Sequence, residues 1–210
     1  MDEIKAITTY YNGFKFRSRL EARWAVFFDA ANIRYEYEPE GIKLKNGMCY
    51  LPDFYLPDED MYVEVKPPRK GAWKDINKAS RFVGNGINCL LLLPNIPPKE
   101  KALWYFPVMY WHPVEYAVRI KWCPICPVDG VGAYIVREII DPIATGFVPA
   151  FDYIKKEAAD RWATSILEAH KDNTENRYED AILDNEDYEQ LGALFDKARQ
   201  ARFEFGEKGN

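Results

Sequence analysis

The stretch CYLPDFYLPDEDMYVEVK, residues 49–66, predicts two strands joined by a tight turn. Apolar and aromatic residues dominate 49–56 and 61–66, as they do in strands that bury one face. The four residues between them, 57–60, are Pro, Asp, Glu and Asp, which favour a turn because Pro presets φ and Asp tolerates turn geometry. We therefore expect an antiparallel hairpin.

The register of this hairpin places two carboxylates opposite each other. With a four-residue loop, Leu56 pairs with Met61, and counting outward pairs Asp53 with Glu64. Facing side chains of an antiparallel pair have Cβ atoms about 4.5–5.5 Å apart, and alternation puts Lys66 on the same face. The other face is expected to be core and carries Tyr50, Phe54, Leu56, Met61, Val63 and Val65.

Two opposed carboxylates beside a lysine predict a cation site. Like charges that face each other destabilise a hairpin, so the pair implies either solvation or a bound cation. Hard oxygen ligands at this spacing suit Mg²⁺ or Mn²⁺. Such an ion lowers the pKa of bound water and neutralises charge on a phosphate, and Lys66 adds a compact positive charge that can hold the phosphate or the attacking water.

A helix is expected from Ser18 to Ala31, with Ser18 as N-cap and Glu21 completing a capping box. Glu21 lies at the edge of the apolar face of this helix, next to the sheet. A carboxylate there is costly unless it is paired or metal-bound, so Glu21 is a candidate third ligand. The apolar face consists of Leu20, Trp24, Phe27, Phe28 and Ala31.

Further elements are expected on both sides of the hairpin. A strand over 34–38 precedes it, and a helix over 73–83 and a buried strand over 87–93 follow it. The order is therefore helix, three strands, helix, strand. Residues 94–149 are rich in Pro and aromatic residues and show no assignable pattern.

The last part of the chain is expected to be mainly helical. Residues 153–170 predict a helix, and 171–187 are polar and acidic, as in a linker. A final amphipathic helix is indicated by the spacing of Leu191, Leu194, Phe195 and Ala198.

Pro52-Asp53 followed by Glu64-Val65-Lys66, after a helix that begins Ser18-Arg19-Leu20-Glu21, resembles the PD-(D/E)XK nuclease superfamily. The pattern is most similar to the TnsA-type endonucleases of transposons and to phage junction-resolving endonucleases, and it covers about residues 10–95. The resemblance implies an α/β restriction-endonuclease-like core, αβββαβ, with a mixed sheet flanked by helices. The core would span residues 1–120, followed by an irregular Cys- and Pro-containing segment, 121–150, and a helical acidic extension, 151–210.

By this resemblance Glu21, Asp53, Glu64 and Lys66 are catalytic, and the metal ligands are Glu21, Asp53, Glu64 and Val65. The implied activity is Mg²⁺- or Mn²⁺-dependent endonucleolytic cleavage of DNA by an enzyme encoded in a phage or mobile element. The pair Pro67-Pro68, directly after the lysine, departs from the pattern.

A basic stretch follows the hairpin and is a candidate nucleic-acid contact. Within it Lys74, Lys78 and Arg81 recur at i, i+4 and i+7 and so share a helix face. Binding of the phosphate backbone and an ordinary solvated helix face are both open. The full candidate set is Arg69, Lys70, Lys74, Lys78 and Arg81.

Other interpretations remain open at this stage. Glu64 and Lys66 could belong to an ordinary solvated strand face. A catalytically silent adaptor or inhibitor with the same fold could bind a nucleic acid or a protein, and RNA is not excluded as a substrate because no residue pattern recognises a 2′-hydroxyl.

Charge is distributed unevenly along the chain. The net charge is −5, but residues 1–126 carry 18 Lys and Arg against 15 Asp and Glu, whereas 127–210 carry 10 against 18. The basic part is compatible with DNA, and the acidic part suggests a protein partner. A dimer is compatible with this pattern, which does not define the oligomeric state.

Membrane insertion and a zinc site are not expected. No segment approaches the run of about 20 apolar residues that a membrane helix needs, and residues 1–5 lack the features of a secretory signal, so a cytoplasmic protein of a bacterium or a phage-infected host is expected. Cys123 and Cys126 have the spacing of half a zinc ribbon, but no second ligand pair is apparent.

Overall fold

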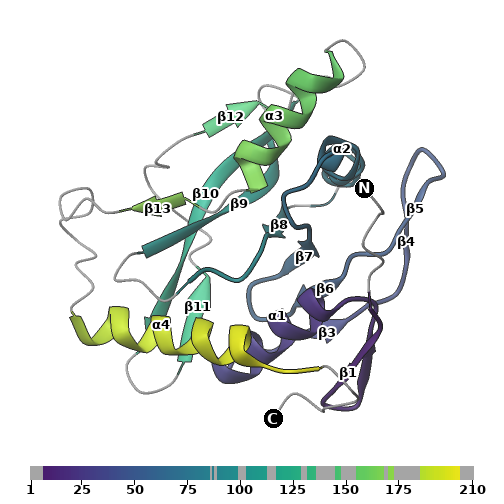
Figure 1. Cartoon of the computed structure of the whole chain (residues 1–210). Coiled ribbons are helices and arrows are strands. Elements are labelled where there is room, and N and C mark those ends of the chain that lie inside the picture. The colour runs from purple at the N-terminus through teal and green to yellow at the C-terminus, as the bar shows by residue number, and fades with distance from the viewer. Residues whose placement is uncertain are drawn as a thin grey trace.

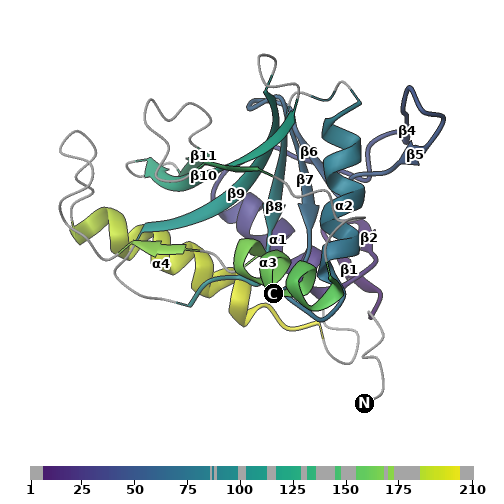
Figure 2. The same ribbon diagram turned by 90° about the horizontal axis from the view of Figure 1, so that it is seen from above.

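The computed structural model describes residues 7–85, 87, 89–98, 103–112, 117–128, 132–135, 145–147, 155–167, 170–172 and 185–203. It shows a mixed α/β protein in which helices cover both faces of a central mixed sheet (Figures 1 and 2). The elements are β1 (Thr9–Tyr11), β2 (Phe14–Phe16), α1 (Arg19–Ala30), β3 (Glu36–Tyr37), β4 (Ile42–Lys43), β5 (Cys49–Tyr50), β6 (Phe54–Leu56), β7 (Met61–Val65), α2 (Ala72–Val83), β8 (Cys89–Leu93), β9 (Leu103–His112), β10 (Ala117–Val128), β11 (Gly132–Ile135), β12 (Thr145–Phe147), α3 (Lys156–Leu167), β13 (His170–Asp172) and α4 (Asn185–Gln200).

The central sheet has the strand order β11-β10-β9-β8-β7-β6-β3, with β12 beside β10 and β13 beside β9. Its strands pair antiparallel except for β7 and β8, which are parallel and are connected through α2. The predicted hairpin register is confirmed, because Leu56 pairs with Met61 and Phe54 with Val63. The predicted order of helix, three strands, helix and strand is also observed, with the β4–β5 hairpin inserted between β3 and β6.

The predicted strand over residues 49–56 is interrupted. β5 ends at Tyr50 and pairs with β4 in a separate hairpin, and β6 begins only at Phe54. Pro52 lies in the break, where a residue without an N–H cannot support a continuous ladder. Alternation therefore cannot be counted across the break, and the prediction that Tyr50 shares a face with Phe54 is wrong. Tyr50 stacks on Phe82 of α2, with ring centroids 4.2 Å apart, on the other side of the sheet.

Two hydrophobic cores lie on the two sides of the sheet. The first joins the sheet to α1 and α4, and the second joins it to α2 and α3. Strand β8 shows the division clearly, since Leu91 and Leu93 belong to the first core and Leu90 and Leu92 to the second. A strand buried on both faces explains the unbroken apolar run that the sequence shows there.

Helix α1 has the predicted apolar face. Trp24, Phe27, Phe28 and Ala31 are buried, and Leu20 packs against them while half-exposed. The indole N–H of Trp24 donates to the carbonyl of Pro94 at 2.8 Å, which ties the helix to the end of β8. This contact satisfies a polar group that would otherwise be buried without a partner.

Several boundaries differ from those expected. The boundary predicted at residue 120 falls inside β10, and the described residues of 121–150 include parts of three strands, β10, β11 and β12. Helix α3 is shorter than the predicted span of 153–170, and β13 begins at His170. Most of the predicted acidic linker, residues 173–184, lies outside the described residues.

Helix α4 packs on α1 and completes the first core. The ring of Phe195 stacks on Phe27 with centroids 4.9 Å apart, and Leu191 and Ala198 are also buried. Figure 1 shows α4 running along the base of the molecule beside α1. Within the described part of the chain, no helix is both long and apolar enough to cross a bilayer.

The position of α4 predicts that its loss destabilises the whole fold. Phe195→Ala should lower the free energy of unfolding by about 3 kcal/mol, because a fully buried aromatic ring is replaced by a cavity. The matched control is Lys197→Ala, at an exposed position of the same helix, with an expected change within about 0.5 kcal/mol. Urea unfolding measures both, and equal stabilities would show that α4 contributes little to the core.

Candidate active site

Asp53 lies directly before β6, and extending the hairpin register by one residue places it opposite Glu64 on β7. Its carboxylate does not point into solvent, since only 4% of the residue is exposed. Oδ2 accepts a hydrogen bond from the backbone N–H of Val65 at 2.8 Å, and the Asp53 carbonyl accepts one from the N–H of Glu38 at 2.9 Å. The Asp53 carboxylate thus accepts the Val65 N–H of β7 in place of a backbone carbonyl, and this bond holds the Asp53 side chain in one orientation.

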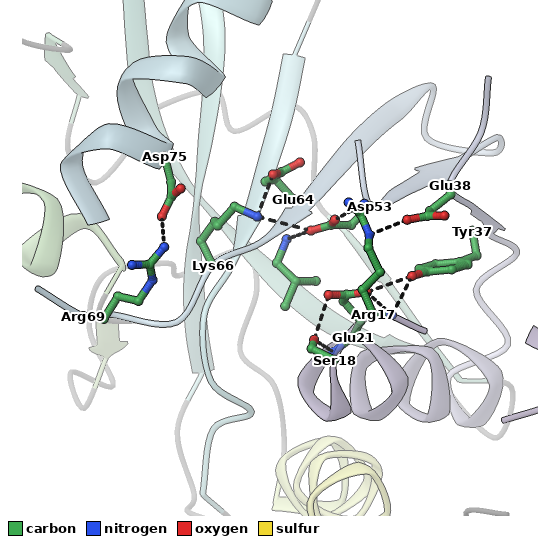
Figure 3. A network of polar contacts seen from close by, with 11 residues as sticks. Arg17, Ser18, Glu21, Tyr37, Glu38, Asp53, Glu64, Lys66, Arg69 and Asp75 are labelled. Atoms are coloured by element: carbon green, nitrogen blue, oxygen red, sulfur yellow. Dashed lines mark hydrogen bonds and ion pairs between the residues drawn. The ribbon is translucent and has the colours of Figure 1, made fainter. Parts of the chain in front are cut away.

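Glu64 is buried beside Lys66. The Lys66 Nζ atom lies 2.7 Å from Glu64 Oε1 and 3.7 Å from Asp53 Oδ2, so one ammonium bridges the two carboxylates (Figure 3). The second oxygen, Glu64 Oε2, is buried and accepts no hydrogen bond of normal geometry from the residues that the structure describes, although Tyr50 is close enough to lower the pKa of Glu64. Most buried carboxylate oxygens have a donor, so this oxygen is available to another ligand.

The environment changes the pKa values of both groups. Burial and the charge of Asp53 raise the pKa of Glu64 to about 7, against the opposing effect of Lys66. Burial disfavours the Lys66 ammonium, but the carboxylates of Glu64 and Asp53 outweigh it and raise the pKa of Lys66. Lys66 therefore stays charged near neutral pH, where Glu64 is poised between its two forms.

Glu21 reaches the same cluster from the N-terminus of α1. Ser18 caps the helix by accepting the Glu21 N–H at 3.1 Å, and its hydroxyl donates to Glu21 Oε1 at 2.7 Å. The other oxygen, Oε2, accepts from the backbone N–H of Arg17 and from the hydroxyl of Tyr37. Burial and the charge of Asp53 raise the pKa of Glu21, so these two carboxylates interact electrostatically.

Arg17 is a member of the cluster that the sequence analysis did not identify. Its guanidinium forms an ion pair with Glu38 through Nε and lies 3.4 Å from Asp53 Oδ1 through the terminal nitrogen. Figure 3 shows it between the Asp53 and Glu38 carboxylates, above Glu21. Glu38 has a φ of +45°, so the backbone bends sharply to bring its carboxylate to Arg17.

Val65, a predicted ligand, takes part through its backbone. Its N–H binds Asp53, and its side chain is buried in the first core. Two tyrosines of the cluster were missed by sequence patterns: Tyr37, whose hydroxyl donates to Glu21, and Tyr50 beside Glu64. Burial and the charge of Glu64 raise the pKa of Tyr50, which places that ring next to the cluster on the side of α2.

The predicted basic residues form an exposed face next to this cluster. Lys78 Nζ lies over the Tyr50 ring, 4.8 Å from its centroid. Tyr50 therefore lies between this lysine of α2 and the Glu64 carboxylate. Arg69 is paired with Asp75 at 2.7 Å. All of the predicted set are exposed, namely Arg69, Lys70, Lys74, Lys78 and Arg81.

The segment between Lys66 and α2 is held at both ends. The N–H of Lys66 donates to the carbonyl of Leu93 at 2.9 Å, and the N–H of Gly71 donates to Asp160 Oδ1 of α3 at 2.7 Å. Gly71 has a φ of +84°, a left-handed conformation that suits glycine. Pro67 and Pro68 lie between these anchors.

A divalent cation fits the donor set, although the ligands are not arranged as a ready-made metal centre. Among the described residues, no three Asp, Glu, His or Cys side chains lie together as a ligand group. Instead the ammonium of Lys66 and the guanidinium of Arg17 separate the carboxylates. The buried and unpartnered Glu64 Oε2 is nevertheless the oxygen donor that Mg²⁺ or Mn²⁺ prefers.

Cys123 and Cys126, which have the spacing of half a zinc ribbon, both lie in β10. The structure describes their backbone and not their side chains, so whether they bind zinc lies outside the described part of the chain.

Known families provide no further assignment. A scan against models of protein families finds no match to this chain, and a search of curated proteins finds none that is significantly similar. The geometry of the site therefore carries the functional argument.

The raised pKa of Glu64 predicts that the metal-free protein loses stability as the pH rises from about 5 to about 8. Folding raises this pKa from 4.5 to about 7, so the folded chain binds the proton more tightly than the unfolded chain. The stabilising effect is complete below 4.5 and disappears as the pH passes through 7.

Glu64→Gln should flatten this pH dependence and leave the part due to Glu21. Thermal unfolding in chelator at several pH values measures the slope. Asp58→Asn, which removes an exposed carboxylate of the hairpin loop, should retain the slope of the natural protein. A natural protein with no more pH dependence than Glu64→Gln would contradict the raised pKa.

Proposed function

We propose that this protein is a metal-dependent nuclease of the PD-(D/E)XK type that hydrolyses phosphodiester bonds in DNA. The observation that carries the proposal is the buried, unpartnered Oε2 of Glu64, next to Asp53 and Lys66 on one hairpin. A buried carboxylate oxygen that accepts no hydrogen bond is available to a cation.

The arrangement of elements supports the finer fold assignment. In the restriction-endonuclease-like core that we propose, α1 supplies Glu21, the β6–β7 hairpin and its flanking residues supply Asp53, Glu64 and Lys66, and α2 and β8 complete the αβββαβ order. The unit would act in the cytoplasm of a bacterium or a phage-infected host.

Asp53, Glu64 and Glu21 would hold Mg²⁺ or Mn²⁺, with the Val65 carbonyl as the further ligand implied by the family resemblance. When bound, the cation supplies charge neutralisation at the phosphate and acidifies a water molecule. Lys66 keeps its positive charge near neutral pH and is placed to hold the phosphate or the attacking water. Asp53 is fixed by the Val65 N–H, so its orientation does not depend on the ligand.

The basic face of α2 is the proposed contact for the DNA backbone. Its three cations, Lys74, Lys78 and Arg81, are exposed, as are Arg69 and Lys70 just before the helix, and Lys78 lies over the tyrosine next to Glu64. Phosphates bound along this face would therefore lead towards the carboxylates. Nothing in the described structure distinguishes DNA from RNA by a contact to a 2′-hydroxyl, so RNA belongs in any substrate panel.

A catalytically silent adaptor or inhibitor with this fold is the alternative. The observation that favours it is that Arg17 and Lys66 neutralise the carboxylates without any metal. In that case the acidic C-terminal part of the chain would engage a protein partner. Its most acidic stretch, 173–184, lies outside the described residues.

Cleavage should require the cluster. With Mg²⁺ or Mn²⁺, Asp53→Asn, Glu64→Gln and Lys66→Met should each reduce the cleavage rate by about 10²-fold or more, the effect of removing one group that stabilises the transition state. Asp58→Asn is the matched control and should cleave normally, because Asp58 is exposed in the loop and pairs with Arg34.

The assay should use linear, supercoiled, branched and single-stranded DNA and RNA, each with metal and with chelator. Metal-dependent products from the natural protein and none from the three variants are expected. Cleavage that persists in Glu64→Gln would refute the site, and absence of cleavage of every substrate would favour the adaptor.

The basic face should determine the salt dependence of binding. Replacing Lys74, Lys78 and Arg81 by Ala should weaken binding to all sequences alike and reduce the slope of log K against log salt by roughly one unit for each lost phosphate contact. Lys197→Ala, on α4 across the sheet, is the control. Fluorescence anisotropy at several salt concentrations measures the slope, and an unchanged slope would mean that this face of α2 is only solvated.

A further inference from the structure

Arg17 performs two separate tasks in the cluster. Its backbone N–H donates to Glu21 Oε2 at 3.1 Å and to the Tyr37 hydroxyl at 3.0 Å. Its side chain turns to Glu38 and Asp53. The backbone hydrogen bonds fix the position of the Arg17 Cα atom, so the guanidinium stays within reach of the Glu38 and Asp53 carboxylates.

The Arg17 guanidinium lies beside Asp53, a proposed metal ligand whose negative charge needs a positive charge nearby when no metal is bound. Asp53 is 4% exposed and sits between Glu21 and Glu64, whose pKa values are raised by burial and then by the charge of Asp53. In a metal-free protein this like-charge repulsion needs positive charge close by. Lys66 supplies it on the side of Glu64, and Arg17 supplies it on the side of Glu21 and Glu38.

The two cations differ in how firmly they are held. The Lys66 side chain is only 24% exposed and lies 2.7 Å from Glu64, whereas the Arg17 side chain is 55% exposed and lies 3.4 Å from Asp53. A half-exposed guanidinium at that distance forms a weak pair and regains water when it leaves. The contact of Arg17 with Asp53 can therefore be broken at low cost while Nε stays paired with Glu38, whereas the buried ammonium of Lys66 is not easily displaced from Glu64.

We propose that Arg17 is a positioning residue that acts as a tethered counter-ion: it neutralises Asp53 in the metal-free protein and competes with the divalent cation for that carboxylate. This inference rests on the proposed metal-dependent function. A bound cation would take over the neutralisation of Asp53 and release the terminal nitrogens of Arg17 to water, or to a phosphate of the substrate, while Nε remains paired with Glu38. The Arg17 backbone would keep capping Glu21 throughout, because these hydrogen bonds do not involve the side chain.

Mn²⁺ binding to the full-length protein without DNA tests this competition. Calorimetric titration of Arg17→Met should give a Kd about tenfold lower than that of the natural protein, because a competing cation has been removed. In chelator the same variant should melt at a lower temperature, since the repulsion of Asp53 is no longer balanced. Added Mn²⁺ should reduce this difference in melting temperature.

Two further variants serve as controls. Lys15→Met removes one positive charge from β2, two residues before Arg17, but Lys15 Nζ lies over the Tyr10 ring instead of against a carboxylate, so the Kd of this variant should stay near the natural value. Arg17→Lys keeps the charge and loses the fork that reaches both Glu38 and Asp53, so its Kd should be intermediate. It also provides the test if Arg17→Met does not fold.

The outcomes separate this inference from the proposed function. Mn²⁺ binding that is lost in Glu64→Gln but unchanged by both Arg17 variants would overturn the competition and leave the metal site standing. Equal tightening in Lys15→Met and Arg17→Met would also overturn it, because a general charge effect would suffice. If the natural protein binds no Mn²⁺, or Glu64→Gln binds it equally well, the proposed metal site fails together with the inference.

Discussion

The hydrogen bond from the Val65 N–H to Asp53 Oδ2 is the interaction on which the site depends. By the hairpin register the residue opposite Val65 is Pro52, where the regular ladder has already ended. A buried N–H without a partner costs about 1–3 kcal/mol, and the carboxylate provides that partner. The same bond determines where Asp53 stands relative to Glu64, so the end of β6 shapes both the sheet and the cluster.

Burying so many charges is possible because the cations are distributed around them. Glu21, Asp53 and Glu64 are each no more than 8% exposed, and burial together with the charge of Asp53 raises the pKa values of Glu21 and Glu64. Hydrogen bonds from Ser18 and Tyr37 offset part of this cost at Glu21. Such a cluster is a poor source of stability, which is the common condition of sites that are selected for binding and chemistry.

The sequence could predict the register, because loop length and alternation are local properties of residues 49–66. It also predicted the buried position of Glu21, since the capping pattern and the apolar face of the helix lie within a few residues. It could not predict Arg17, whose contacts to Glu38 and Asp53 join segments 21 and 36 residues away. The strands β9 and β10 were missed because Pro107 and Pro124 lie within them, and proline normally indicates that a strand has ended. Nor does an amphipathic pattern show which face of the sheet a helix such as α4 will cover.

The two prolines after Lys66 now have a physical meaning. Each fixes its own φ near −65° and reduces the freedom of the unfolded chain, so ordering this segment costs less entropy than an ordinary loop. With Lys66 bound to Leu93 and Gly71 bound to Asp160, the segment is short, stiff and anchored at both ends. It acts as a rigid spacer between β7 and α2. The distance between Lys66 and the basic face of α2 is therefore set by this segment. A long ligand that contacts both Lys66 and α2 must adopt a shape that matches this distance.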